Sequence, residues 1–399
     1  MERMIMWGEA FVLALIPMSL TVPYKTDFQK KIINSVYIWI FFGAFYGILL
    51  SYSVWKEETV FYYLLRHLCF FYYALFFFIG YKWGDLLLEW LGRFFVPLIA
   101  FTIFKTFFIH GVGISISMWM GLLWMAILRK RNSQGTFLTG ALLLVLFHYI
   151  CGSGSTKIIA YFFLLCPAFL FFLKVWNRST QVWYVFQRLI FRVLLVVLLC
   201  AIVWVTIRFG SLFFEMVSVG NAIEDFTQFG GRGSTLNPIE DFVDINAGWR
   251  IAFWVYLLYR FISHPLGIGL GTPLFDPQVA YFLHMPLITG AEYVVPAHNF
   301  FITFLVRLGI PFLLLFVWMA FWSGRMVFKY LRQVHFNPLK NPESRLVFAS
   351  LMVFSIAFWM AFFNAVLESP LYAWSFWLTF GIFIRFCGDY VSKKDAVIL

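Results

Sequence analysis

The sequence is poor in charged residues. Only 12% of its 399 residues are charged, against about 25% in a typical soluble domain, and 62% are hydrophobic. The mean hydropathy is +0.84. A chain of this length cannot hide so much apolar surface inside itself, which excludes a soluble globular protein and requires that lipid cover the rest. The 53 phenylalanines suit lipid-facing helices and interfacial aromatic belts.

Redox and metal-binding motifs are also missing. The five cysteines lie in or beside apolar runs without CxxC spacing, which indicates packing rather than redox or zinc chemistry: Cys69, Cys151, Cys166, Cys200 and Cys387. There is no DxD motif, and the acidic residues between 210 and 298 form no obvious ligand cluster. No cleavage site follows the first apolar run, so we expect a retained helix there.

What the sequence does have is a series of apolar stretches of bilayer length. We count eleven, at about 4–22, 32–50, 59–81, 94–109, 112–128, 136–151, 157–174, 189–209, 299–322, 346–363 and 370–387. The stretch 83–109 is long enough to hide a re-entrant piece, so twelve crossings is an alternative. The sequence therefore predicts an all-α polytopic membrane protein with 11–12 transmembrane helices.

Cations between these stretches predict the orientation. If the spans alternate, the cationic segments fall on one side, which is then cytoplasmic. They are Lys25, Lys30 and Lys31; Arg129, Lys130 and Arg131; Lys174, Arg178 and Arg188; Arg325, Lys329, Arg332, Lys340 and Arg345; and Arg385, Lys393 and Lys394. The net charge of +11 is mostly this bias. Because it is split among short loops, we expect membrane lipids rather than nucleic acid as its partner.

A long polar interruption divides the chain. We expect transmembrane helices at 1–209, a periplasmic loop at 210–298 and further transmembrane helices at 299–399. The loop holds eight acidic residues and no lysine, and its only cations are Arg232, Arg250 and Arg260. Orientation does not explain arginines in an acidic outer loop, whereas their planar fork binds phosphate with two hydrogen bonds.

The apolar stretch 249–263 inside this loop is short for a span, and a crossing here would reverse every later loop. We therefore expect a helix in the outer leaflet, with a twelfth span as the alternative. The sequence HPLGIG follows at 264–269, where Pro265 ends the helix and the glycines allow close backbone approach. The GIGLG string is not the dinucleotide-binding fingerprint, because no strand precedes it.

Polar residues gather again where the chain re-enters the membrane. His298 is either an interfacial residue that caps a helix or a catalytic group, and Asn299 suits an N-cap. Arg307 lies some two turns inside the same predicted helix, so it must face a polar cavity or pair with an acid. Glu368, near the outer end of a later helix, is the acid placed to pair with it.

The order of these motifs resembles the Wzy-C superfamily of bacterial membrane glycosyltransferases, the O-antigen ligases and O-antigen polymerases. The shared pattern is an arginine before an aromatic-rich helix, then HPLGIG, a variable outer loop, and His-Asn heading a helix that reaches Leu-Gly. The resemblance implies a GT-C-like membrane fold. It also implies a place in the bacterial inner membrane, with the active site facing the periplasm.

The resemblance implies inverting, metal-independent glycosyl transfer without a cofactor. The donor is a glycan on undecaprenyl diphosphate, and the acceptor is lipid A–core for a ligase or a lipid-linked repeat unit for a polymerase. Ligases and polymerases share the motifs, but the net positive charge of the chain and its compact outer loop favour a ligase. A secondary transporter is the alternative from another class, but it predicts internal repeats and polar residues at mid-bilayer, which the sequence does not have.

Site roles follow by matching positions. The resemblance assigns diphosphate binding to Arg250, because a cation stabilises the charge on the leaving group. It makes His298 the general base, with Asn299 orienting it or the acceptor, and Glu368 as the next candidate base.

The remaining polar candidates have no fixed catalytic role. The second phosphate-binding arginine is not set by a motif: Arg208 ends a span at the outer surface, and Arg232 lies in a GGRGS loop whose amides can approach phosphate. His264 belongs to the HPLGIG turn, where we expect a structural role, and Arg307 is a further polar candidate.

Overall fold

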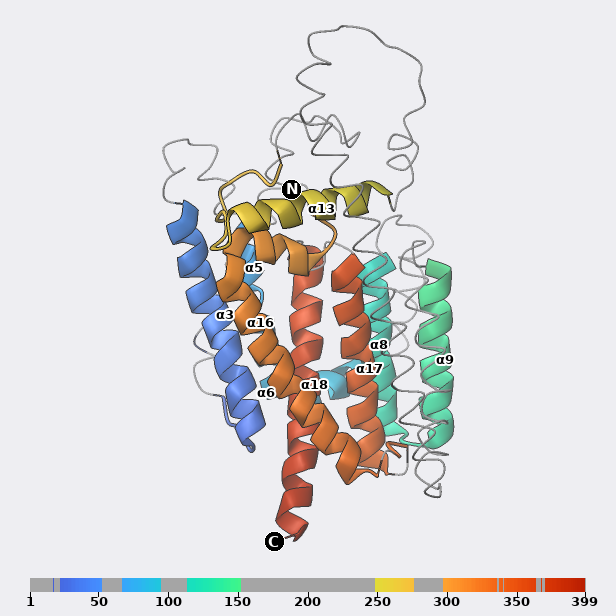
Figure 1. The fold of residues 1–399 in the computed structure, drawn as a ribbon. Coiled ribbons are helices and arrows are strands. Elements are labelled where there is room, and N and C mark those ends of the chain that lie inside the picture. The colour runs from blue at the N-terminus through green and yellow to red at the C-terminus, as the bar shows by residue number, and fades with distance from the viewer. Residues whose placement is uncertain are drawn as a thin grey trace, which may run out of the picture.

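Helices alone make up the regular structure of the described chain. The computed structural model describes residue 17 and residues 22–51, 67–94, 113–151, 248–275, 297–335, 337–339, 341–363, 367 and 370–398. Within these residues every regular element is helical, which confirms the predicted all-α membrane fold. Most helices run side by side as a bundle, and one lies across its end (Figure 1).

The helices have the following bounds. They are α3 (Asp27–Ser51), α5 (Cys69–Tyr72), α6 (Leu75–Arg93), α8 (Gly113–Lys130), α9 (Gln134–Cys151), α13 (Gly248–Ser263), α16 (Phe300–Gln333), α17 (Pro342–Phe363) and α18 (Pro370–Ile398). Three of them, α3, α16 and α17, are long and apolar enough to cross a membrane by themselves. The total of eleven or twelve crossings stays a prediction, because several expected spans lie outside the described residues.

Several boundaries differ from the prediction. The expected span 59–81 is wrong at its end: the chain turns at Tyr73 and Ala74, and α6 continues to Arg93 through Lys82 and Asp85. Hydropathy ends a span at its first charges, but the α6 backbone stays hydrogen-bonded past them and Asp85 finds an ion-pair partner in Arg129. Helix α18 likewise extends to residue 398, beyond the expected 387, because its polar end is tied to neighbouring helices by ion pairs.

Aromatic packing holds the bundle together. Helix α18 lies in its middle and touches α3, α6, α8, α16 and α17. Trp39 of α3 packs edge-on against Phe304, with ring centroids 4.8 Å apart, and also reaches Trp377 of α18. Gly80 and Gly381 let α6 and α18 approach so closely that a side chain at either would collide with the opposite backbone. Small residues at helix crossings serve the same purpose in many membrane proteins.

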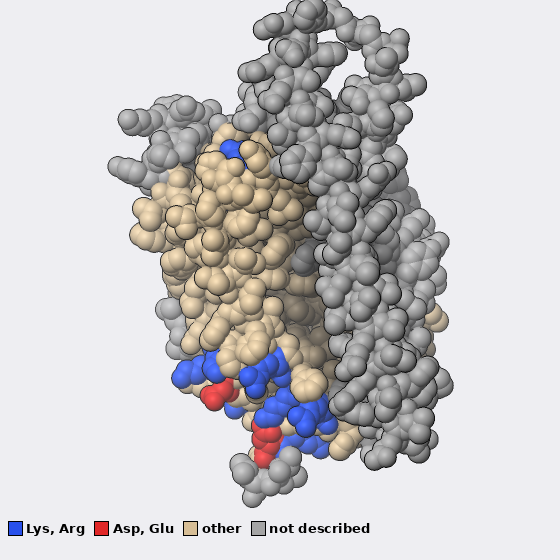
Figure 2. Space-filling model, in the orientation of Figure 1, with Lys and Arg blue, Asp and Glu red and all other residues tan. Residues whose placement is uncertain are grey.

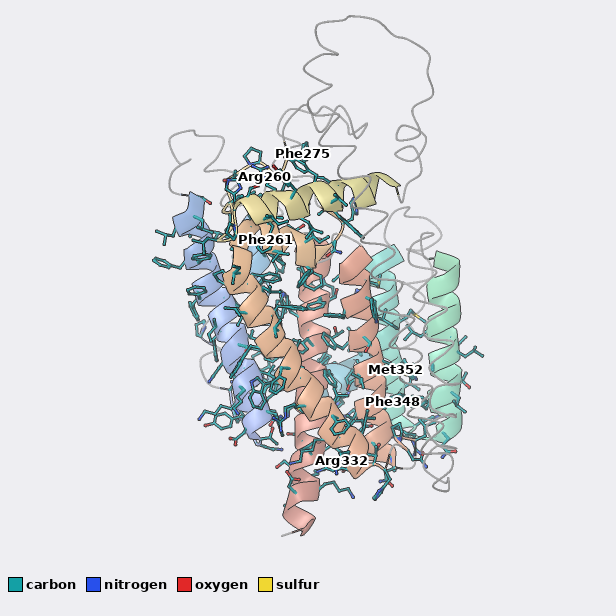
Figure 3. All side chains as sticks on the ribbon, viewed as in Figure 1. Arg260, Phe261, Phe275, Arg332, Phe348 and Met352 are labelled. Atoms are coloured by element: carbon teal, nitrogen blue, oxygen red, sulfur yellow. The ribbon has the colours of Figure 1, made fainter. Side chains whose placement is uncertain are left out.

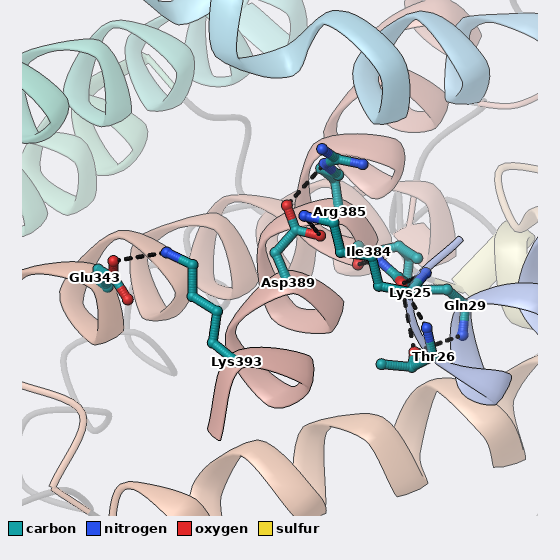
Figure 4. Close-up of polar contacts among 8 residues, drawn as sticks. All are labelled: Lys25, Thr26, Gln29, Glu343, Ile384, Arg385, Asp389 and Lys393. Carbon is teal, nitrogen blue, oxygen red and sulfur yellow. Dashed lines mark hydrogen bonds and ion pairs between the residues drawn. The ribbon is translucent and has the colours of Figure 1, made fainter. Parts of the chain in front are cut away.

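Cationic residues gather at one end of the bundle, called here the basic end (Figure 2). Lys25 pairs with Asp389 at 3.2 Å, Lys393 with Glu343 at 2.8 Å, and Arg385 with Asp389 at 2.9 Å (Figure 4). These pairs join the start of α3, the start of α17 and the end of α18. The expected gathering of the cationic segments on one side is therefore confirmed for the described ones; Lys174, Arg178, Arg188 and Lys340 lie outside the described residues.

Helix α13 covers the opposite end, called here the α13 end (Figure 1). It lies across the bundle and packs on the start of α16. The two share a separate apolar cluster that includes Phe253 and Leu257 of α13 and Ile302 and Val306 of α16. This orientation is the one expected of a helix that does not span. The position of α13 in the outer leaflet, and the alternative of a twelfth crossing at 249–263, stay predictions.

Candidate functional site

Helix α16 is broken at Gly309, which separates a short outer helix (300–308) from the long helix that crosses the bundle (310–333). Gly309 has φ 64° and ψ −151°, which only glycine adopts readily, and Pro311 follows at the start of the second helix. The expected span at 299–322 therefore lies within α16, but the helix is kinked at Gly309. Arg307 lies two turns inside α16, as expected, at the end of its outer part.

The turn that contains HPLGIG, residues 264–272 and here called the motif loop, clasps this break. Its amides of Ile268 and Gly269 donate to the carbonyls of Val306 and Arg307 at 3.0 and 2.9 Å. In return, the amide of Ile310 donates to the carbonyl of Pro265 at 2.8 Å. Helix ends leave such groups without partners, and in a membrane protein they cannot be left to lipid. The motif loop therefore completes the backbone hydrogen bonding of both halves of α16.

Arg307 holds the motif loop from inside. Its side chain is 1% exposed, and Nη1 donates to the carbonyls of Gly269, Leu270 and Thr272 at 3.1, 2.9 and 3.2 Å. A buried charge is stable only when it is paired or hydrogen-bonded, and three carbonyl dipoles meet part of that need. The expectation that Arg307 faces a polar environment is thus met by backbone carbonyls. Glu368, its expected partner, lies outside the described residues.

The outer end of α3 and His67, two residues before α5, anchor the same loop. Ser51 Oγ accepts from the amides of Leu270 and Gly271 at 2.8 and 3.0 Å, and Tyr46 donates to the Leu266 carbonyl at 2.7 Å. His67, also buried, contacts the Leu270 carbonyl through Nδ1 at 2.6 Å. A carbonyl only accepts, so Nδ1 carries the proton, and in the neutral ring Nε2 accepts from Arg307 Nη2 at 3.5 Å.

Helix α13 meets the turn before α16 through Trp254. The indole nitrogen donates to the carbonyl of Ala297 at 2.6 Å, directly before His298. The apolar cluster that α13 shares with α16 also takes in Phe275, which Figure 3 labels at this end of the molecule. The turn that carries His298 is therefore fixed from above by α13 and from below by the outer helix of α16.

His298 has an unusual backbone. Its φ of 53° lies in the left-handed region, which a residue with a side chain seldom adopts. Its side chain is partly exposed. Asn299 follows in extended conformation, and its side chain accepts from the amide of Ile302 at 3.1 Å. Asn299 is thus the N-cap of α16, as one reading of the sequence had it, and His298 is partly exposed on the turn that precedes it.

Arg250 lies in the first turn of α13, one helical turn before Trp254. Positions four apart share a helix face, so the backbone places Arg250 on the stripe that carries the Trp254 contact. Its side chain is outside the described residues, as are Arg208 and Arg232. For these three arginines phosphate binding stays a prediction.

His264 has a structural surrounding. Its side chain is exposed, its amide donates to the Arg260 carbonyl at 3.0 Å, and its Nδ1 donates to the same carbonyl at 3.3 Å. The carbonyl of His264 accepts from Gly267 at 2.8 Å. The residue thus terminates α13 and starts the motif loop.

Two contacts of this region escape the sequence motifs. Ser51 and His67 lie more than 200 residues before the loop that they bind. The usable signal was His67 itself, a polar residue beside an apolar run, which by default deserves a functional or structural explanation. Among the described residues no three His, Cys, Asp or Glu side chains come together as a metal-binding group.

Comparison with known proteins agrees with this geometry. Residues 141–317 match the family model described as O-antigen ligase, Wzy-C. The match includes α13, the motif loop, the His298 turn and the break at Gly309. No curated protein matches the chain. The predicted resemblance to the O-antigen ligase (Wzy-C) superfamily is confirmed over residues 141–317.

Proposed function

We propose that the protein transfers a glycan from undecaprenyl diphosphate to an acceptor hydroxyl at the α13 end, the periplasmic face of the inner membrane. The observation that carries the proposal is the meeting of HPLGIG, Leu308-Gly309 and the His298 turn in one hydrogen-bonded unit. This unit lies at the end of the bundle opposite the cations, which is where an outer-face enzyme requires its site.

The reaction makes two demands on the protein. The acceptor oxygen forms a bond to the anomeric carbon on the face opposite the diphosphate, which leaves with the electron pair of the broken C–O bond, so the configuration inverts. The hydroxyl proton must go to a base, and the diphosphate charge must be stabilised. In our proposal His298 takes the proton and Arg250 binds the diphosphate.

The position of His298 supports its role as base. It is partly exposed on a turn that is fixed on both sides, by Trp254 through Ala297 and by the Asn299 cap. A fixed imidazole needs no reorganisation when it accepts a proton. The left-handed backbone at His298 is consistent with this, because strained conformations persist where the surroundings hold them and often occur at functional sites.

An apolar groove of about 240 Å³ supports a polyprenyl-linked donor. It starts at Phe300, two residues after His298, and continues between α16, α17 and α18 to Phe383. Its lining is almost wholly aromatic and aliphatic, with Phe316, Phe358 and Trp377 among the largest side chains. A prenyl segment in this groove would hold its diphosphate near the His298 turn.

Arg307 is in our proposal a positioning residue and not a phosphate ligand. Its Nη1 is committed to three carbonyls of the motif loop, and His67 contacts both the guanidinium and one of these carbonyls. Together they fix the loop that follows α13 and precedes the His298 turn. The net positive charge and the compact outer loop favour, in our proposal, a ligase that acts on lipid A–core, in lipopolysaccharide biosynthesis.

The proposal is tested with purified protein in liposomes, supplied with a glycan on undecaprenyl diphosphate and with lipid A–core. The wild type should produce glycan-capped lipid A–core. His298→Ala should lose turnover by a factor of about a hundred or more while it still binds donor, because the base acts only in the transition state. Arg250→Ala should lose both donor affinity and turnover. His264→Ala is the matched control, an exposed histidine of the same region that should retain activity.

Three results decide the assignment. Near wild-type turnover of folded His298→Ala would remove it as the base and make Glu368 the next residue to test. Longer chains on the donor lipid, without capping of lipid A–core, would identify a polymerase. The rate of the wild type should also fall in acid, since a protonated imidazole cannot accept a proton.

A further inference from the structure

The second feature of interest lies at the basic end, on the seam between α3 and α16. Lys31 of α3 holds its ammonium 3.6 Å from the centre of the Trp322 ring of α16. The guanidinium carbon of Arg325 lies 5.7 Å from the same ring and 5.5 Å from Phe321. Two cations from different helices therefore meet at one indole, at the level where tryptophans mark a membrane interface.

The residues that α16 contributes here lie on one face of the helix. Trp318, Trp322, Arg325 and Lys329 are spaced i, i+4, i+7 and i+11, which places them along one side of the helix. The groove beside His298 uses other positions of α16, among them Phe316, Met319 and Ser323. The cation–indole cluster is thus separate from the groove, and it lies at the opposite end of the molecule from the α13 end.

Charge at this seam is not balanced by the protein. Lys329 is neutralised by Asp395 at 2.6 Å, and Lys25 and Lys393 have carboxylate partners too. Within the described chain, Lys31 and Arg325 form no such ion pair. Asp27 is the one acid of α3, and α16 has none. Two cations near one ring repel each other, so an anion between them would lower the energy.

Above the cations the surface is apolar. Trp318, Phe321 and Val317 of α16 are exposed, as are Ile38 and Phe41 of α3. These side chains continue from the cations towards the middle of the bundle, along helices long enough to cross the bilayer. A ligand that fits has an anionic head and acyl chains beside it. Inorganic phosphate satisfies only the first requirement.

We propose that Lys31, Trp322 and Arg325 form a binding site for the headgroup of an anionic phospholipid. The occupant is a single lipid of the leaflet at the basic end, with its phosphate between the two cations and its chains on the apolar seam. The inference stands on this surface alone and does not depend on the proposed transferase mechanism.

Native mass spectrometry of the full chain tests the site. The purified protein is titrated with phosphatidylglycerol, with phosphatidylcholine and with inorganic phosphate. Each cation near a membrane phosphate contributes enough that Lys31→Gln/Arg325→Gln should weaken phosphatidylglycerol binding by about thirtyfold. The matched control is Lys82→Gln/Lys394→Gln, which removes the same charge from exposed sites; Lys82 also lies 5.6 Å from a tryptophan ring. A charge-retaining variant, Lys31→Arg, should bind as the wild type does.

A selective loss in the first double variant, with the control unchanged, supports the site. Equal losses in both double variants would overturn it, because they would indicate general attraction to anionic lipid. Equal affinity for phosphatidylcholine, or binding of inorganic phosphate that competes with the lipid, would overturn it as well. If the double variant does not fold, the single Arg325→Gln change at an exposed residue serves, and an unchanged affinity there contradicts the proposal.

Discussion

Two cations, Arg307 at the α13 end and Lys393 at the basic end, are held in opposite ways. At the α13 end Arg307 is 1% exposed, and its Nη1 donates to backbone carbonyls of the motif loop. At the basic end Lys393 and Glu343 form an ion pair with side chains 65% and 63% exposed. A buried group whose partner is removed loses far more free energy than an exposed pair does. Removal of Arg307 should therefore disturb the α13 end far more than removal of Lys393 disturbs the basic end.

The largest loss of stability is expected for Gly309→Ala, at the α13 end. A side chain at this position would collide with the backbone of Pro265 and Leu266, and its φ of 64° disfavours any other residue. We expect a cost on the order of 4 kcal/mol or more and little folded protein. Gly324→Ala in the same helix meets no atom within 4 Å and should fold normally. Membrane yield and thermal melting measure both. A stable Gly309→Ala variant would show that the motif loop does not clasp the break.

Arg307→Met sharpens the contrast between buried and exposed cations. It keeps the length of the side chain but removes the donor to three carbonyls, so we expect a loss of about 3 kcal/mol and a clearly lower melting temperature. Arg307→Lys should fall between, because an ammonium lacks the planar fork. Arg332→Met, in the exposed part of α16, is the control. Equal melting temperatures of the two methionine variants would show that the buried hydrogen bonds of Arg307 add no more stability than an exposed arginine does.

A smaller effect is expected for Ser51→Ala. The change leaves the buried amide of Gly271 without its acceptor and the amide of Leu270 with only the Gly47 carbonyl at 3.4 Å, which costs about 1–3 kcal/mol. Ser350→Ala provides the comparison, since that buried hydroxyl only donates to a carbonyl of its own helix, that of Val347. Melting temperature and transferase turnover should both fall for Ser51→Ala and stay nearly unchanged for Ser350→Ala. The reverse order would mean that α3 does not anchor the motif loop.

The smallest effect is predicted at the basic end, for Lys393→Gln. The hydrogen bond to Glu343 raises the pKa of Lys393, so the lysine stays charged at any working pH and the pair is present throughout. An exposed pair nevertheless contributes at most about 0.5 kcal/mol, and less in salt. Melting curves of the variant and the wild type should coincide within error at physiological ionic strength. A shift of several degrees would contradict the distinction between the two ends.

Features with a local signal are predictable from the sequence. The length and apolar stripe of 249–263 predict a helix across the bundle, and the cationic loops predict the basic end. The motifs HPLGIG and His-Asn predict the family, although the roles assigned to Arg250 and His298 stay predictions. A signal for the broken helix also exists, because Gly309 and Pro311 interrupt an apolar run. Hydropathy averaged over a window does not register it.

Other features depend on contacts that no local pattern records. Nothing near Ser51 or His67 in the sequence points to the motif loop, because their partners follow more than 200 residues later. Likewise, the position of Arg307 within an apolar run indicates only that its charge needs a partner. The choice of backbone carbonyls rather than a carboxylate as partners for its Nη1 depends on how the loop folds over the helix end.

The clasp of the motif loop also sets the order of events during biogenesis. Tyr46 and Ser51 leave the ribosome about 220 residues before Leu266 and Gly271, their partners in the loop. At synthesis rates of about 5–20 residues per second this delay is roughly 10–45 s. Over that interval α3 is in the membrane, but the loop that binds the Tyr46 and Ser51 hydroxyls at its outer end has not yet been synthesised. A chain interrupted before residue 272 should therefore leave an incomplete bundle in the bilayer, in which Tyr46 and Ser51 lack their partners in the motif loop.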